Sequence, residues 1–334
     1  MKHPLRQVVI GCLTVVAALL ALGSVPARAA TTAVCPPAGG VGTADAPTPS
    51  TGVLIVQGHG WGHSLGMSQY GAQGAARLGC SAATILSTYY TGTALAQQTL
   101  RPTVKLRLLR DEPAGRSTAQ ALVGTLTWVA VDANVSVVQP QGETWTVQRR
   151  ADGRGIVLLD AAGAQRFWIN TGGVLRLQER GSVARVRSFG GADGTTVRTD
   201  LQLRWDDTEL SSSSLGLSVN QVLRDDASAS AVQKYLWGLA EVPVSWPAAA
   251  LQAQAIAART YLVAGYADAS DPSTYTIGTT SATQNYGGYR QESLDQAYGG
   301  AWRAAVDATD RQVIVTPDGL PINAVYSSSA GGRT

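Results

Sequence analysis

A small-residue segment in the last third of the chain has the apolar period of a helix. Pro247 suits the first helical turn because its φ is fixed and it has no amide hydrogen to leave unbonded. Apolar residues then recur three and four positions apart on one face, at Leu251, Ala255, Ala258 and Leu262. The pattern predicts a helix from Pro247 to about Gly265, with its cap at Ser245 or Trp246.

Polar residues flank the apolar face of this predicted helix on both sides. Gln252 and Arg259, seven positions apart, lie along one margin, and Gln254 and Tyr261 lie along the other. An alanine-rich helix packs closely against its neighbours and can present donors from both margins. We therefore expect these polar groups to lie beside Glu241, which precedes the helix.

A second patterned region lies in the first hundred residues. It predicts a strand from Val53 to Gln57, a helix from about Met67 to Leu78 and a helix from about Ser81 to Tyr90. A glycine-rich loop between the strand and the first helix contains His59, Trp61 and His63. Two histidines four apart suggest zinc only on a helix, which the interspersed glycines disfavour. No third ligand is near, so we expect no metal and no other cofactor.

Between these regions the period changes from helical to alternating. Short alternating runs separated by Gly, Asp and Asn predict a β-rich region, with strands at Val104–Leu109, Leu122–Val131, Trp145–Arg149, Val183–Arg187, Leu201–Trp205 and Leu217–Leu223. Four tryptophans are spread through it, namely Trp128, Trp145, Trp168 and Trp205. Such residues either pack in a core or form a platform on which sugars stack.

The first 29 residues have the composition of a secretory signal peptide. Lys2 and Arg6 supply a positive start, Val8–Leu22 is apolar, and Ala27–Ala29 has the small residues of a cleavage site. The apolar stretch is short for a membrane span. We therefore expect a secreted protein that has no membrane span once the signal is removed.

Charge is balanced in the predicted mature chain. The whole sequence has 26 Lys and Arg against 23 Asp and Glu. Removing the signal peptide takes away Lys2, Arg6 and Arg28 and no acid, which leaves 23 residues of each sign. A balanced chain gives no indication of nucleic-acid binding, and a neutral glycan is an acceptable partner.

Two cysteines remain in the predicted mature chain, Cys35 and Cys80, because Cys12 leaves with the signal. In an exported protein such a pair indicates one disulfide, and two free thiols are the alternative. The disulfide would join the Pro/Gly/Thr-rich linker of residues 30–52 to the first folded unit.

Glu241 is the only acid between Asp226 and Asp268, and its neighbours in sequence are apolar. A carboxyl group in apolar surroundings tends to keep its proton, because desolvation disfavours the charged form. A raised pKa suits a general acid that works near neutral pH. A loop glutamate at the entrance of a buried alanine-rich helix is the structural alternative.

Two strings in the chain resemble one known family. The first, E-x-P-x-S-W-P-x-x-A-L-x-A-Q-A-x-A-A-R-T-Y, runs from Glu241 to Tyr261, and the second, G-H-G-W-G-H-x-x-G-M-S-Q-Y-G-A, runs from Gly58 to Ala72. Both are similar to motifs of the stage II sporulation protein D / amidase enhancer (SpoIID/LytB) family. The second string normally follows the first, whereas here it precedes it, as in the actinobacterial-type arrangement.

The resemblance implies a peptidoglycan lytic transglycosylase with Glu241 as its general acid/base, cutting glycan strands to anhydro-muramyl ends. It also implies a glycan groove that includes the histidine loop and residues on and after the helix, namely Gln252, Gln254, Arg259, Gln284, Tyr286, Tyr326, Ser327, Ser328, His59, Trp61 and His63. The alternative is a non-catalytic wall-binding module or an amidase enhancer, with a cell-wall amidase as its partner. Gly278 and Thr283 stand where relatives often carry metal-binding or paired residues, so neither zinc nor a disulfide carries over.

These observations together predict an α+β protein of several units. We expect a signal peptide (1–29), a linker (30–52), a loop and helical unit (53–98), a β-rich region (99–200) and an α+β catalytic domain (201–334) around the alanine-rich helix. Compared with the family pattern, the C-terminal end of the catalytic domain looks shortened after Tyr326.

Overall fold

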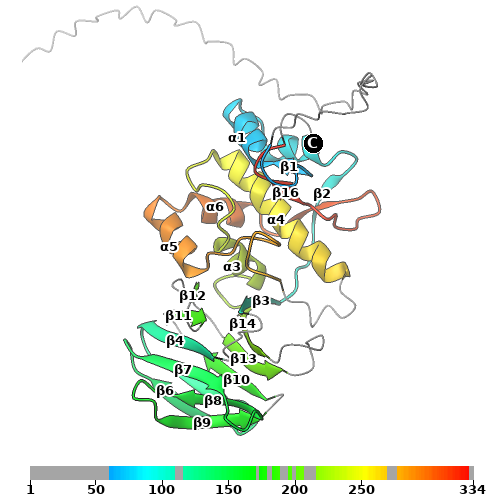
Figure 1. Ribbon diagram of the computed structural model, residues 1–334. Helices are drawn as coiled ribbons and strands as arrows, with labels where there is room; N and C mark the ends of the chain where they lie inside the picture. Colours follow the sequence, from blue (N-terminus) through cyan, green and yellow to red (C-terminus); the bar gives the residue numbers. More distant parts are fainter. Residues whose placement is uncertain are drawn as a thin grey trace, which may run out of the picture. The chain divides into compact units, whose positions relative to one another are not determined.

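The computed structural model describes residues 60–109, 116–170, 173–178, 183–188, 195–197, 201–206, 216–268 and 277–330. Helices and strands both contribute to it, which confirms the predicted α+β class. In Figure 1 one group of elements is a layered set of strands, and the other is a set of helices around the long helix α4 (Ala248–Asp268). The predicted strand at 53–57 and His59 lie outside the described residues.

Two antiparallel sheets form the strand group. The first sheet has the order β3 (Thr103–Leu109), β14 (Gly216–Arg224), β13 (Leu201–Asp206), β10 (Val174–Gln178), β5 (Leu126–Ala130) and β6 (Val135–Gln139). The second has the order β12 (Thr195–Val197), β11 (Val183–Ser188), β4 (Arg116–Val123), β7 (Thr144–Arg149), β8 (Gly155–Leu159) and β9 (Gln165–Asn170). β13 and β14 therefore pair with strands of the predicted β-rich region.

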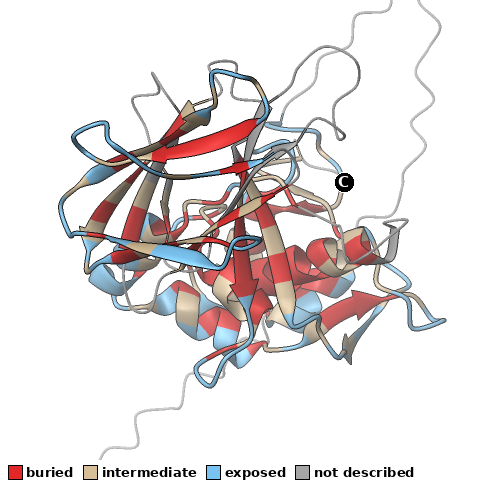
Figure 2. Cartoon of the chain, turned by 90° about the horizontal axis from the view of Figure 1, so that it is seen from below, coloured by how far each residue is buried: buried red, intermediate tan, exposed pale blue. Residues whose placement is uncertain are grey.

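Tryptophan side chains fill the space between the two sheets. Trp128 and Trp145 have no exposed surface, which settles both as core residues. Buried positions lie along the strands as well as along the helices (Figure 2). The indole nitrogen of Trp128 donates to Gln139 Oε1 at 2.8 Å, and Gln139 Nε2 donates to the Ala119 carbonyl of the other sheet at 3.0 Å. This buried amide satisfies its polar atoms while it joins the sheets. Trp168, on the edge strand β9, is 47% exposed.

Most predicted strands agree with the observed ones, and one does not. The run from Leu122 to Val131 was expected to be continuous, but the chain turns within it between β4 and β5. Gly124 has a φ of 69°, a conformation that glycine adopts without steric cost. The two halves of the run consequently belong to different sheets.

Helix α4 is the centre of the helical group. It is packed by α1 (Gln69–Arg77), α2 (Ala82–Tyr89), α3 (Ala231–Trp237), α6 (Ala301–Ala308) and β15 (Gln312–Val315), which pairs with β2 (Ala94–Gln97). Every residue from Ala253 to Thr260 is buried. Gln254 and Arg259, one from each predicted polar margin, are thus covered by neighbouring elements, whereas Gln252 and Tyr261 are only partly buried. Helix α5 (Tyr289–Ala297) packs on α6.

A short parallel pair of strands joins the start and the end of the described chain. β1 (Met67–Ser68) pairs with β16 (Tyr326–Ser327), Met67 opposite Tyr326. The approach is close at Gly66, where an added Cβ would lie 1.9 Å from the Val325 carbonyl oxygen and φ is 68°. Only glycine fits there, so the glycine-rich loop is held against the C-terminal segment.

Two further features concern the export and linker predictions. Cys80 is disulfide-bonded, and the only other cysteines of the sequence, Cys12 and Cys35, lie outside the described residues. Within the described ranges, no helix combines the length and apolar character that a membrane crossing requires.

Candidate active site

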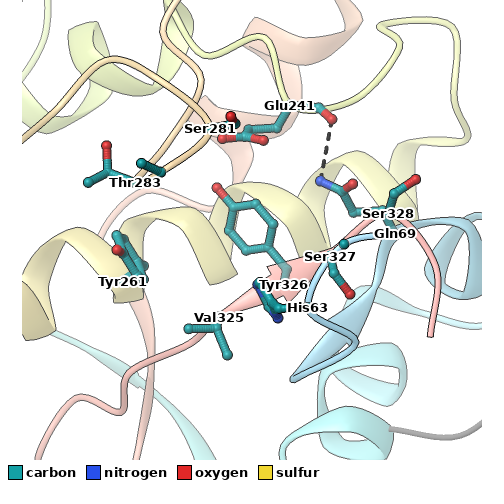
Figure 3. A pocket seen from close by; sticks show the side chains of 12 residues that line it. His63, Gln69, Glu241, Tyr261, Ser281, Thr283, Val325, Tyr326, Ser327 and Ser328 are labelled. Atoms are coloured by element: carbon teal, nitrogen blue, oxygen red, sulfur yellow. Dashed lines mark hydrogen bonds between the residues drawn. The ribbon is translucent and has the colours of Figure 1, made fainter. Parts of the chain in front are cut away.

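One pocket brings together segments from both ends of the chain around Glu241 (Figure 3). Tyr261 and Thr283 lie on one side of it, Gln69, Ser327 and Ser328 lie on the other, and Glu241 and Tyr326 lie between them. Its full lining is Gly62, His63, Gln69, Glu241, Tyr261, Ser281, Ala282, Thr283, Val325, Tyr326, Ser327 and Ser328. Glu241 is the only carboxyl group in that lining, which contains no Lys or Arg.

The loop that carries Glu241 follows α3 and is fixed to the segment around Asn285. Leu239 forms an antiparallel bridge with Tyr286, and the Ala240 amide donates to the Asn285 carbonyl at 2.8 Å. The Asn285 amide in turn donates to Glu241 Oε1 at 2.6 Å. Backbone pairing therefore sets the position of the carboxyl group as well as that of the loop.

Burial raises the pKa of Glu241 above its ordinary value. The Asn285 amide and the Tyr326 hydroxyl lower it, because both donate hydrogen bonds to the charged form, but they do not offset the desolvation. The group accordingly keeps its proton to higher pH than an exposed glutamate does. This is the protonation state that a general acid requires.

A chain of hydrogen bonds behind Glu241 has a fixed direction. Gln284 Nε2 donates to the Ala258 carbonyl at 3.2 Å, and this acceptor-only partner identifies which end of the amide is nitrogen. The same nitrogen donates to the Tyr326 hydroxyl at 2.9 Å, and Gln284 Oε1 accepts from the Tyr235 hydroxyl at 2.6 Å. The Tyr326 proton is then left for its hydrogen bond with Glu241.

Replacing Tyr326 with phenylalanine is expected to raise the pKa of Glu241 further. The change removes a donor that stabilises the carboxylate and leaves the ring in place. Titration of the glutamate side-chain carbons by NMR measures this directly and does not depend on catalysis. The other titratable groups in the pocket are His63 and Tyr261.

Tyr261→Phe is the matched control, because Tyr261 lines the same pocket, whereas the donors to the Glu241 carboxyl group are the Asn285 amide and the Tyr326 hydroxyl. We expect the Glu241 titration in this variant to match that of the parent. If the pKa of Glu241 is unchanged or lower in Tyr326→Phe, the Tyr326 hydroxyl does not stabilise the Glu241 carboxylate.

Gln69, which the sequence analysis did not select, ties α1 to the Glu241 loop. Its Nε2 donates to the Glu241 backbone carbonyl at 3.3 Å (dashed in Figure 3) and to Gln254 Oε1 at 3.4 Å. Ser68 caps α1 by accepting the Gly71 amide at 3.1 Å, which places Gln69 at the first helical position. The only local signal was its place after this capping serine.

The histidine loop contributes His63 to the pocket and Trp61 to its border. His63 Nδ1 accepts the Leu65 amide hydrogen at 3.0 Å, so in neutral His63 the proton is on Nε2. Trp61 pairs with Ser329 through backbone hydrogen bonds of 2.8 and 3.2 Å. The structure thus places His63 in the same pocket as Glu241 although they are far apart in sequence, while His59 lies outside the described residues.

Other predicted groove residues are not in the pocket. Arg259 is fully buried and donates to the Val306 and Gln312 carbonyls at 3.1 Å each, which corrects its assignment to the groove. The pocket lining likewise lacks Gln252, which is half-buried, and the buried residues Gln254, Gln284 and Tyr286. Resemblance to a motif indicates which residue types are shared with a family. Whether a given side chain can reach a ligand depends on whether it is buried in this structure.

Two serines predicted for the groove do line the pocket, and one has an unused polar atom. Ser327 is 6% exposed, and its hydroxyl oxygen is buried without a hydrogen-bond partner. A buried unpartnered hydroxyl that borders a pocket can bond to a ligand there. Among the residues that the structure describes, no group of three or more His, Cys, Asp or Glu is placed to hold a metal ion.

Comparison with known proteins assigns part of the chain to a family. Residues 227–315 match the SpoIID family model, described as Stage II sporulation protein. No curated protein and no solved structure matches the chain. The matched segment contains α3, Glu241, α4, α5, α6 and Gln284, whereas His63, Gln69 and Tyr326 lie outside it. The match supports a cell-wall-related role, and it makes residues 227–315 similar to the SpoIID domain.

Proposed function

We propose that the protein is a secreted lytic transglycosylase that cleaves peptidoglycan glycan strands at the Glu241 pocket. The observation that carries the proposal is the chemistry of the lining, in which one partly buried carboxyl stands among neutral polar groups. Ordinary glycosidases use two carboxyl groups on the two sides of the scissile bond. A lytic transglycosylase needs one, because the sugar itself supplies the nucleophile.

In the first step Glu241 donates its proton to the glycosidic oxygen as the bond from that oxygen to the sugar C1 breaks. The 6-hydroxyl oxygen of the same sugar then bonds to C1, and its proton passes to Glu241. The products are a free 4-hydroxyl end and a 1,6-anhydro end, and the carboxyl group recovers its starting state. The raised pKa of Glu241 favours the first step, and the Tyr326 and Asn285 donors stabilise the carboxylate between the steps.

Neutral donors and acceptors surround the position of the sugar. The Nε2–H of His63 and the hydroxyls of Ser327 and Ser328 come from the two chain ends, and Ser281 and Thr283 face them. Hydroxyl and acetamido groups of a glycan pair with such side chains without leaving a charge buried. The lining has no Lys or Arg that would select an anionic ligand.

Product analysis distinguishes this mechanism from the alternatives. Purified glycan strands incubated with the protein are expected to yield soluble fragments with 1,6-anhydro ends, each lighter by one water than a hydrolysis product in mass spectrometry. Fragments with hydrated reducing ends would contradict the mechanism. Binding to insoluble peptidoglycan without release of fragments would instead favour a non-catalytic wall-binding module or amidase enhancer.

A further inference from the structure

An exposed aromatic side chain stands next to the pocket on α1. Tyr70 follows the pocket residue Gln69, and 57% of it is exposed. Its ring meets the ring of Trp246 edge to face, with centroids 5.2 Å apart and an angle of 60° between planes. Trp246 is 9% exposed and lies on the loop between Glu241 and α4. The Tyr70 ring is therefore supported from one side and open to solvent on the other.

Trp61 is fixed close to the same edge of the pocket. The Tyr70 amide donates to the Ser328 carbonyl at 3.1 Å, and Trp61 pairs with Ser329, the next residue. Ser328 itself lines the pocket. Trp61 is 78% exposed, so two aromatic side chains stand out beside consecutive residues at the Ser328 side of the pocket. We refer to Tyr70 and Trp61 as the aromatic rim.

The aromatic rim lies to one side of Glu241, where a polymeric ligand would extend out of the pocket. Glu241 lies between the Tyr261 side and the Ser328 side of the pocket (Figure 3). A strand cleaved in its interior must leave the pocket in two directions. On the Ser328 side a departing strand would pass the exposed side chains of Tyr70 and Trp61.

We propose that the aromatic rim is a second sugar-binding site, which holds the glycan strand beyond the pocket at its Ser328 side. The apolar faces of pyranose rings pack on exposed aromatic side chains, and the Trp246 contact fixes the Tyr70 ring in advance of binding. This inference rests on the proposed function only in taking a glycan as the ligand. It predicts that affinity depends on strand length, because only a long strand reaches from the pocket to the rim.

The test measures binding in the Glu241→Gln background, so that no ligand is consumed. The probes are β-1,4-linked N-acetylglucosamine oligomers of increasing length, and the measurement is isothermal titration calorimetry. Tyr70→Ala is expected to weaken the binding of long oligomers about tenfold, the loss that corresponds to removing one aromatic contact. Trp61→Ala is expected to act in the same direction, and short oligomers should bind as in the parent.

Tyr298→Ala is the matched control, because Tyr298 is 68% exposed at the end of α5 and is absent from the pocket lining. In every variant, unchanged affinity for short oligomers shows that the pocket is folded. Tyr70→Phe keeps the aromatic ring and should therefore bind long oligomers with the affinity of the parent. If Tyr70→Ala binds long oligomers with the same affinity as the parent, the aromatic rim is not a sugar-binding site. The unmodified protein could fail to cleave glycan while Tyr70→Ala still loses affinity for long oligomers alone. That result would contradict the proposed transglycosylase activity and support the aromatic rim as a sugar-binding site.

Discussion

Replacement of Glu241 by glutamine is expected to reduce the rate of glycan cleavage by about a hundredfold to ten-thousandfold. General acid–base catalysis contributes factors of that size, and the amide can neither donate the proton nor accept it. Glutamine retains an Oε1 that can accept the Asn285 amide hydrogen, so the loop keeps its backbone pairing. Fragment release from labelled glycan strands measures the rate.

Two accompanying measurements make the result specific. Glu241→Gln should unfold at the same temperature as the parent and still bind insoluble peptidoglycan. Glu292→Gln provides the matched control, since Glu292 lies in the first turn of α5 and not in the pocket lining, and it should cleave at the parental rate. Full cleavage by Glu241→Gln would remove this residue from the mechanism.

Arg259→Met is expected to lower the free energy of unfolding by about 1–3 kcal/mol, the cost of leaving buried hydrogen-bond acceptors without their donor. The guanidinium reaches the carbonyls of Val306 and Gln312 and the hydroxyl of Thr309, all within or after α6. Methionine fills part of the volume but leaves these acceptors unpaired. Burial lowers the pKa of Arg259 to about 10, partly offset by Asp310 and Asp307, so it is charged at neutral pH.

Urea unfolding gives the free energy, and Arg311→Met serves as its control. Arg311 is beside Asp310 on the surface, with 65% of its side chain exposed, and its loss should change stability by only about 0.5 kcal/mol. The folded fraction of Arg259→Met should retain glycan binding because Arg259 does not reach the pocket. If Arg259→Met had the stability of the parent but bound glycan more weakly, Arg259 would have to be counted as a groove residue.

Local patterns predicted helices α1, α2 and α4 and several of the strands, whereas α3, α5 and α6 were not predicted. Pro247 and the small-residue period predicted α4 to within a few residues, since both act through the backbone of the same segment. Alternation predicted β3, β7 and β11 because one face of each is in the core. The strand break at Gly124 was missed, as the apolar residues continue on both sides of the turn.

A site residue could be predicted only where the neighbouring residues in sequence, and not distant parts of the chain, determine its surroundings. Glu241 could be selected because its sequence neighbours are apolar and the nearest other acids are distant. Arg259 was misplaced because helical periodicity gives the face of a residue but not what covers that face. Gln69 was missed because its role depends on Glu241, which is 172 positions away in the chain. Contacts of this kind follow from the fold as a whole.

The pairing of β1 with β16 has a consequence for the order in which the protein becomes functional. Met67 meets Tyr326 only after almost the whole described chain has been synthesised, although Glu241 and α4 precede this event. Closing such a long loop is entropically costly and is typical of late, slow folding steps. The pocket is therefore completed late in folding, and until then the Glu241 carboxyl group lacks the tyrosine and the serines that line the pocket beside it.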